Sequence, residues 1–127
     1  MKILVIEDHP AELKLAHHVL SAAGHSVSEA DAAGRAMLAI KEDPPEIILV
    51  DLTLPGMDGL SLIRKLKTDA ATRAIHIVAI TAHPEKYSKA DALAAGCDAY
   101  LLKPLNTRDL PEQLAAIANS THIEDAP

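Results

Sequence analysis

The sequence predicts an α/β fold in which a parallel β-sheet is covered by helices on both faces, in a doubly wound arrangement. Short apolar runs alternate with amphipathic stretches five times along the 127 residues, which predicts five βα repeats. The strongest runs, at residues 3–6 and 47–50, are unbroken and rich in Ile, Leu and Val, as is typical of strands buried on both faces. Strands that alternate with helices of this length favour one parallel sheet with right-handed crossovers.

The first two repeats differ in the polarity of their strands. After the first apolar strand, a helix begins near Pro10, and Gly24 ends it. Residues 26–29 are short and polar, which predicts a strand near an edge of the sheet. The helix of the second repeat runs from about residue 32 to residue 41, with Asp31 in the N-cap position.

The last three repeats begin with the third strand, which leads into its helix through a turn rich in Pro and Gly at residues 54–59. The fourth strand spans residues 75–80. Pro84 predicts the start of the fourth helix, because proline is favoured in the first helical turn. The fifth strand spans residues 99–102, and Asn106 is in position to cap the last helix.

Length and composition fit one domain, which we expect at residues 1–119, followed by a polar C-terminal tail at residues 120–127. The net charge of −6 and the lack of a basic stripe argue against direct nucleic-acid binding. Cys97 is the single cysteine, so no disulfide can form within the chain. No apolar run reaches the length of an export signal or a membrane span, and we therefore expect a cytoplasmic protein without membrane contact.

Polar side chains follow four of the predicted strands at the point where each strand ends. The first strand ends in Glu7 and Asp8, and the third ends in Asp51. The fourth ends in Thr81 and the fifth in Lys103. Because the carboxyl ends of parallel strands meet at one edge of the sheet, we expect these side chains to converge.

Such a cluster predicts a metal site that can bind and transfer phosphoryl groups. Neighbouring carboxylates repel one another, and a bound cation removes that cost. Oxygen ligands without His or Cys indicate a hard ion, here Mg²⁺, held by Asp8, Asp51 and a backbone carbonyl, with Glu7 acting through water. A carboxylate can attack phosphorus to form an aspartyl phosphate. Lys103 and Thr81 would then contact the oxygens of the transferred group.

Four segments carry a family resemblance: ILVIEDHP, IILVDLTLPGMDG, IVAITAH and AYLLKP. Together they resemble the receiver domains of bacterial response regulators, the CheY-like superfamily, over residues 2–119. The resemblance implies a flavodoxin-like (βα)5 fold with strand order 2-1-3-4-5. It also implies a function in two-component signalling, in which a histidine kinase or a phosphotransfer protein donates a phosphoryl group to the domain.

The resemblance assigns roles to the acidic residues. Asp51 is similar to the phosphoacceptor of the family. Glu7 and Asp8 resemble the acidic pair that binds Mg²⁺ together with Asp51, and Thr53 would supply the backbone carbonyl ligand.

The resemblance also assigns a switch. Thr81 resembles the hydroxyl that moves toward the phosphoryl group, Lys103 the lysine that pairs with it, and Tyr100 the switch aromatic. The bond between Lys103 and Pro104 is expected to be cis. His83 occupies a position that tunes the lifetime of the phosphoryl group in the family, and its alternative role is to cap the helix before Pro84.

The expected output is protein contact rather than catalysis on an outside substrate. In the family the signalling surface comprises the fourth helix, fifth strand and fifth helix, which correspond here to about residues 84–95, 98–102 and 106–118. No segment resembles an effector domain, so we expect a downstream protein target and a monomer or a phosphorylation-dependent dimer.

Three other functions have specific sequence requirements. A phosphorylation-independent interaction module would usually lack the acceptor Asp, an acidic partner or the Lys. A flavodoxin-type protein would need a phosphate-binding loop after the first strand to hold a flavin mononucleotide, but Glu7 and Asp8 stand there. A phosphohydrolase of the haloacid dehalogenase type would need a second Asp where Thr53 stands.

Overall fold

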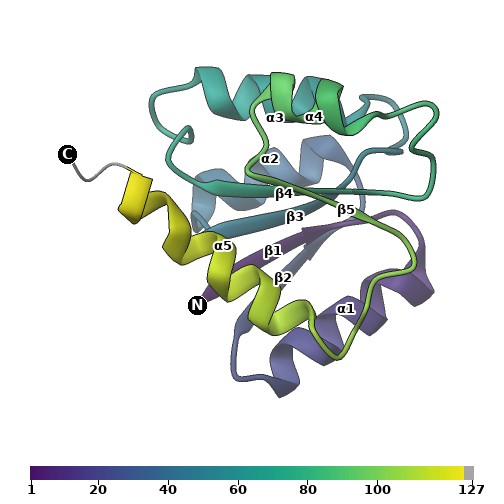
Figure 1. Cartoon of the computed structure of the whole chain (residues 1–127), viewed down its shortest axis with the longest axis vertical. Helices are drawn as coiled ribbons and strands as arrows, with labels where there is room; N and C mark the ends of the chain where they lie inside the picture. Colours follow the sequence, from purple (N-terminus) through teal and green to yellow (C-terminus); the bar gives the residue numbers. More distant parts are fainter. Residues whose placement is uncertain (125–127) are drawn as a thin grey trace.

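The computed structural model describes the backbone of residues 1–124 and the side chains of residues 1–119. Within this range five strands alternate with five helices (Figure 1). The strands are β1 (Lys2–Ile6), β2 (Ser26–Ala30), β3 (Ile47–Asp51), β4 (His76–Thr81) and β5 (Ala99–Leu102). The helices are α1 (Pro10–Ala22), α2 (Ala33–Glu42), α3 (Gly59–Thr68), α4 (Lys89–Ala95) and α5 (Leu110–Glu124). The predicted alternation of strands and helices is confirmed.

The five strands form one parallel sheet in the order β2-β1-β3-β4-β5. This order confirms the doubly wound, flavodoxin-like arrangement. The chain runs from β1 to the polar edge strand β2, crosses back to β3, and continues outward to β4 and β5. The direction of winding therefore reverses between β1 and β3, and in such sheets ligands bind at the carboxyl ends of the strands beside this point.

Helices α1 and α5 cover one face of the sheet, and α2, α3 and α4 cover the other (Figure 1). Successive strand residues point to opposite faces, so β1 contributes Ile3 and Val5 to the first core and Leu4 and Ile6 to the second. Aliphatic side chains dominate both cores, and each fully buried Leu or Ile contributes about 1.5–3 kcal/mol. Packing on both faces thereby fixes the strand ends relative to one another.

The turn between β3 and α3 packs tightly against the end of β3. A Cβ atom added at Gly59 would lie 2.6 Å from Leu52 Cα and 3.0 Å from the Asp51 carbonyl oxygen, so only glycine fits here. Asp58 caps α3, because its Oδ1 accepts a hydrogen bond from the Ser61 N–H at 2.8 Å. These contacts determine the path of the chain directly after Asp51.

The prediction that the fourth helix begins at Pro84 is wrong, because α4 begins at Lys89. Pro84 lies in a turn, and Ser88 is the N-cap of α4. The preceding residue, Tyr87, is only 8% exposed, and its carbonyl oxygen accepts a hydrogen bond from the Tyr100 hydroxyl. We attribute the late start of α4 to this burial, which holds the segment before Ser88 in a turn.

Of the two predicted helix caps, that of Asp31 differs from the structure. Asp31 does not cap α2, whose N-cap has no side-chain hydrogen bond; it pairs instead with Arg35 at 3.2 Å. The Asn106 Oδ1 accepts hydrogen bonds from the N–H groups of Arg108 at 3.1 Å and Asp109 at 3.3 Å, and its carbonyl accepts that of Leu110 at 3.0 Å, so Asn106 caps the turn that leads directly into α5.

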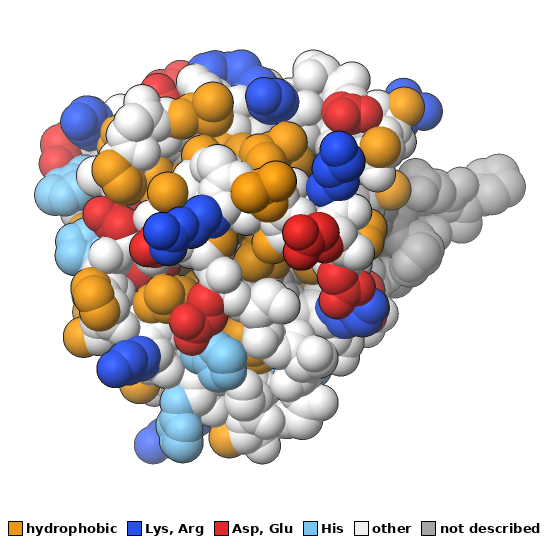
Figure 2. Space-filling view, turned by 180° about the vertical axis from the view of Figure 1, so that it is seen from behind, with side chains coloured by type: hydrophobic (Ala, Val, Ile, Leu, Met, Phe, Trp, Pro, Cys, Tyr) orange, Lys and Arg blue, Asp and Glu red, His pale blue; other side chains and the backbone are white. Residues whose placement is uncertain are grey.

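Helix α5 continues to Glu124, past Ser120, where we placed the start of the polar tail. Residues 125–127 of that tail lie outside the described residues. No helix among residues 1–124 is both long enough and apolar enough to cross a bilayer. Seen from behind, the molecule carries positive and negative side chains interspersed with hydrophobic ones (Figure 2).

Candidate functional site

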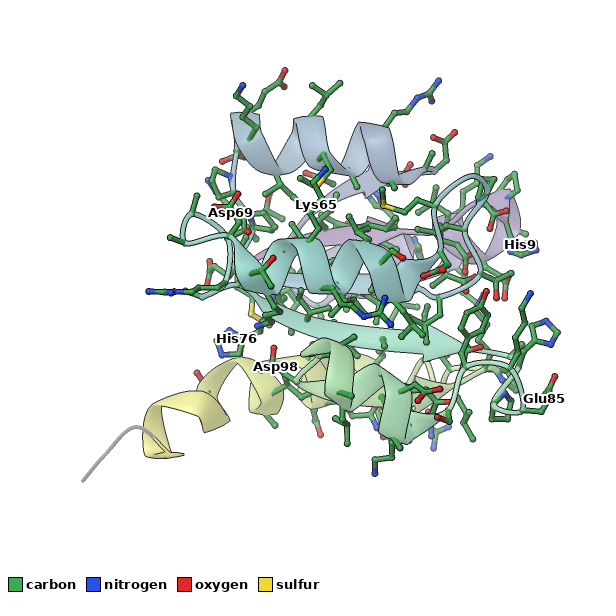
Figure 3. All side chains as sticks on the ribbon, turned by 90° about the horizontal axis from the view of Figure 1, so that it is seen from above. His9, Lys65, Asp69, His76, Glu85 and Asp98 are labelled. Atoms are coloured by element: carbon green, nitrogen blue, oxygen red, sulfur yellow. The ribbon has the colours of Figure 1, made fainter. Side chains whose placement is uncertain are left out.

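The two ends of the sheet carry different sets of side chains. Viewed from above, His9 and Glu85 lie at the end toward which the arrow of β4 points, whereas Asp69, His76 and Asp98 lie at the opposite end (Figure 3). The end with His9 is the carboxyl edge of the strands, where the strand-end prediction placed the site.

Asp51 ends β3, and its carboxyl group is almost fully buried, at 2% exposure. The Thr53 N–H donates a hydrogen bond to Oδ1 at 2.8 Å. The Lys103 Nζ donates one to Oδ2 at 2.8 Å. Both oxygens of Asp51 therefore have a fixed donor, one from the loop after β3 and one from the loop after β5.

Lys103 bridges the ends of three neighbouring strands. Its Nζ donates hydrogen bonds to Glu7 Oε1 at 2.6 Å and to Asp51 Oδ2 at 2.8 Å, and it lies 3.2 Å from Glu12 Oε1. The backbone N–H of Lys103 donates a hydrogen bond to the Thr81 carbonyl at 2.9 Å, which links Lys103 to the end of β4. The peptide bond between Lys103 and Pro104 is cis.

The three buried ionisable groups influence one another. Burial lowers the pKa of Lys103, but the hydrogen bonds with Asp51 and Glu7 outweigh this effect and raise it, so the amine stays charged. Burial raises the pKa of Glu7, and the nearby Asp51 raises it further. Burial also acts to raise the pKa of Asp51, yet its hydrogen bonds with Glu7, Lys103 and the Thr53 amide lower it overall. Glu7 is thus the more easily protonated carboxyl group, and Asp51 remains the carboxylate.

Four side chains could hold a metal ion: ligand atoms of Glu7, Asp8, His9 and Asp51 all lie within 4.8 Å of one another. Asp8 Oδ1 is buried and accepts no hydrogen bond, although His9 Nδ1 lies 3.3 Å away. A histidine therefore lies beside the predicted oxygen ligands, with His9 Nδ1 also 3.0 Å from Glu7 Oε2.

Sequence reasoning missed His9, which belongs to this cluster, and Glu12, which lies beside it. Glu12 lies in the first turn of α1, with Oε2 3.1 Å from His9 Nδ1 and Oε1 3.2 Å from Lys103 Nζ. Their positions in the sequence could have indicated them. Both follow the acidic pair, in the loop and the first helical turn that a doubly wound fold places beside the site.

Thr81 ends β4 and is fully buried. Its Oγ1 accepts a hydrogen bond from the His83 N–H at 2.9 Å. The His83 ring pairs with Glu85 at 3.4 Å, and its carbonyl accepts the N–H of Tyr87 in the turn after β4. The backbone of His83 thus caps the turn at Pro84, whereas its ring points to a partner outside the acidic cluster.

Tyr100 lies on β5, directly beside Ala79 of β4. Its ring is partly buried and packs against the core under α2, α3 and α4. Its hydroxyl donates a hydrogen bond to the Tyr87 carbonyl. The hydroxyl contact of Tyr100 therefore links β5 to the segment before α4.

The comparison with known protein families agrees with this geometry. Residues 3–115 match the sequence profile of the response regulator receiver domain. This chain belongs to that family. It is a receiver domain of the kind found in the response regulators of two-component systems.

Receiver domains in longer and in shorter proteins resemble this one. The phosphate regulon transcriptional regulatory protein PhoB of Pseudomonas aeruginosa is 34% identical over 98% of this chain and 54% of PhoB. Response regulator PleD of Caulobacter vibrioides is 38% identical over 83% of this chain but only 23% of PleD. The chain thus spans about half or less of these two relatives. Protein PilH of Pseudomonas aeruginosa is 28% identical, over 91% of this chain and 96% of PilH.

The fold also matches solved receiver structures. The crystal structure of a CheY-like response regulator receiver domain protein from Methanospirillum hungatei JF-1 superimposes with a TM-score of 0.88. The two chains are 28% identical, and the match covers 97% of each. The receiver fold therefore extends over nearly the whole of this chain.

Proposed function

We propose that this receiver domain accepts a phosphoryl group on Asp51 from a phosphohistidine of a sensor histidine kinase or a phosphotransfer protein. One observation carries the proposal: Lys103 and the Thr53 amide hold the two oxygens of the buried Asp51 carboxylate at the carboxyl edge of the sheet. The lowered pKa keeps this carboxylate anionic, as nucleophilic attack on phosphorus requires.

In the proposed transfer, a carboxylate oxygen of Asp51 forms a bond to phosphorus while the bond between phosphorus and the histidine nitrogen breaks. The imidazole leaves with the electron pair of that bond. Lys103 pairs with one oxygen of the transferred group, and the Thr81 hydroxyl donates a hydrogen bond to another. Attack by water on the aspartyl phosphate later returns the domain to its resting state, and we propose that His83, next to Thr81, tunes that rate.

The side chains fit a magnesium ion. The carboxylates of Asp8 and Asp51 and the backbone carbonyl of Thr53 would hold it, with Glu7 acting through water. The buried Asp8 Oδ1 supports this assignment, because it accepts no hydrogen bond and so has lone pairs available for a cation. Bound magnesium would supply positive charge that offsets both the clustered carboxylates and the phosphoryl oxygens. His9 is a poorer ligand for such a hard ion than the oxygen donors.

We propose that phosphorylation acts through Thr81 and Tyr100. Movement of the Thr81 hydroxyl toward the phosphoryl group breaks its hydrogen bond with the His83 N–H. Tyr100 then turns toward the vacated space and releases the Tyr87 carbonyl. The segment before α4 is thereby freed, which shifts the population between two states of the surface formed by α4, β5 and α5.

The proposed output is contact with a downstream protein through that surface. Leu93 on α4 is 46% exposed and Leu102 on β5 is 53% exposed, and both offer apolar area to a partner. The net charge of −6 favours a protein partner over a nucleic acid. The proposal also includes a cytoplasmic location, away from the membrane, and a monomer or phosphorylation-dependent dimer.

The decisive test is the mass of the intact protein after incubation with acetyl phosphate and magnesium. We expect wild-type protein to gain the mass of one phosphoryl group and Asp51→Asn to gain none, because the amide cannot act as the nucleophile. Asp58→Asn, which alters an exposed carboxylate at the cap of α3, is the control and should be modified as wild type is. An adduct on Asp51→Asn would place the acceptor elsewhere.

A further inference from the structure

Lys103 has three carboxyl partners, and they differ in their access to water. An ammonium group has three N–H donors. Two of them serve Glu7 and Asp51, whose side chains are 3% and 2% exposed. The third partner is Glu12, which lies 3.2 Å from Nζ and is 46% exposed. Of these three contacts, only that with Glu12 can be exchanged for water without leaving a buried carboxylate unpaired.

Glu12 also contacts the histidine beside the acceptor. Its Oε2 lies 3.1 Å from His9 Nδ1, which is itself 4.0 Å from Asp51 Oδ2. Glu12 therefore connects Lys103 and His9 across the acceptor carboxylate, and it places a further negative charge where a phosphoryl donor must approach.

We propose that Glu12 is a positioning residue that holds Lys103 in the resting state and must release it before phosphoryl transfer. This inference rests on the proposed function of Asp51. An arriving phosphoryl oxygen needs a donor on Lys103, and the Glu12 carboxylate competes for it. When Glu12 swings into water, the amine is free to pair with the phosphoryl group while it keeps its bonds to the two buried carboxylates.

The expected size of the effect follows from the charge of Glu12. A single charge changes the local concentration of a doubly charged donor by about three- to tenfold when the two lie several ångströms apart in partly exposed surroundings. Neutralising Glu12 should therefore favour binding of a small anionic donor more than it changes the rate of the bond-forming step.

The test compares Glu12→Gln with wild type in the initial rate of phosphorylation by acetyl phosphate at saturating magnesium. In this reaction, Asp51 forms a bond to phosphorus as the bond between phosphorus and the bridging oxygen breaks and acetate leaves. We expect the half-saturating concentration of acetyl phosphate to fall by about three- to tenfold, with a smaller change in the maximal rate. The difference should shrink as salt is added, and it should be smaller with phosphoramidate, which carries less charge at neutral pH.

Two further variants separate the charge of Glu12 beside Lys103 from a change in the net charge of the protein. Glu42→Gln removes an exposed carboxylate at the C-terminal end of α2, beside Lys2 and Asp43 at the opposite edge of the sheet, and should behave as wild type does. Glu12→Asp keeps the charge and should stay closer to wild type than Glu12→Gln. An unchanged or raised half-saturating concentration for Glu12→Gln would overturn the inference, as would an equal effect of Glu42→Gln. Failure of wild type to be phosphorylated at all would refute the proposed function instead.

Discussion

At the scale of single residues, Lys103 pairs with two buried carboxylates and is also the proposed partner of the phosphoryl group. Glu7 and Asp51 are buried side by side at the ends of neighbouring strands, and the Lys103 amine is hydrogen-bonded to both. Buried carboxylates are costly without a cation, because they lose hydration and repel each other. The same amine is proposed to pair with the phosphoryl group, so the resting pairing already places it where the transferred group would arrive.

Replacing Lys103 by Ala should lower the free energy of unfolding by about 2–4 kcal/mol without magnesium, since two buried carboxylates lose their cation. Urea unfolding followed by circular dichroism measures this loss. Magnesium should recover part of it, because a divalent ion can offset the same carboxylates. Lys65→Ala on the exposed side of α3 is the matched control and should change stability by less than about 0.5 kcal/mol. Equal losses in the two variants would show that Lys103 does not stabilise the buried pair.

At the scale of secondary-structure elements, the join between β3 and α3 is the most constrained part of the site. Gly59 lets α3 begin in contact with Leu52, immediately after the acceptor strand. The Thr53 amide that binds Asp51 Oδ1 lies in the same connection. The position of the Asp51 carboxylate therefore depends on how closely this helix approaches the strand.

Gly59→Ala should destabilise the protein by about 1–3 kcal/mol, because the new Cβ would overlap backbone atoms that cannot move aside. Phosphorylation of Asp51 should also slow, since the strain falls on the segment that holds its carboxylate. Gly34→Ala in α2 is the matched control: nothing lies within 4 Å of the added Cβ, and the change should stabilise the protein by about 0.4–1 kcal/mol. Thermal unfolding of the two variants should thus shift in opposite directions, and a shift in the same direction would contradict the packing argument.

At the scale of the whole molecule, both cores are built from small and branched aliphatic side chains, and the single thiol of the chain is buried with them. Cys97 is buried at 6% exposure between α4 and β5. Burial raises the pKa of the Cys97 thiol, and the neighbouring Asp98 acts in the same direction. Little reactive thiolate is therefore present in the native protein at neutral pH.

Alkylation of Cys97 should consequently report opening of the fold. We expect iodoacetamide to label the native protein slowly and the protein in concentrated urea rapidly, with one adduct in each case, as followed by intact mass. Destabilised Gly59→Ala should be labelled faster than wild type in native buffer. Rapid labelling of wild type without urea would mean that α4 and β5 separate far more readily than the rest of the sheet.

Most of the fold could be predicted from sequence because its strands, apart from β2, are continuous apolar runs. The residues that end these runs, such as Asp51 and Lys103, then followed from the parallel sheet. Glu12 could not be found in this way, because its approach to Lys103 depends on the packing of α1. The start of α4 was misplaced because Pro84 suits a turn as well as a first helical turn, and the burial of Tyr87 depends on the tertiary fold.

The division of the interior by the sheet has a consequence for how such a domain can diverge. Strand residues that face α1 and α5 belong to one core, and their neighbours in sequence belong to the other. The hydrogen-bonded sheet thus separates substitutions that change the packing on one of its faces from the packing on the other face. A substitution in the core under α1 and α5 can therefore be accommodated without repacking α2, α3 and α4.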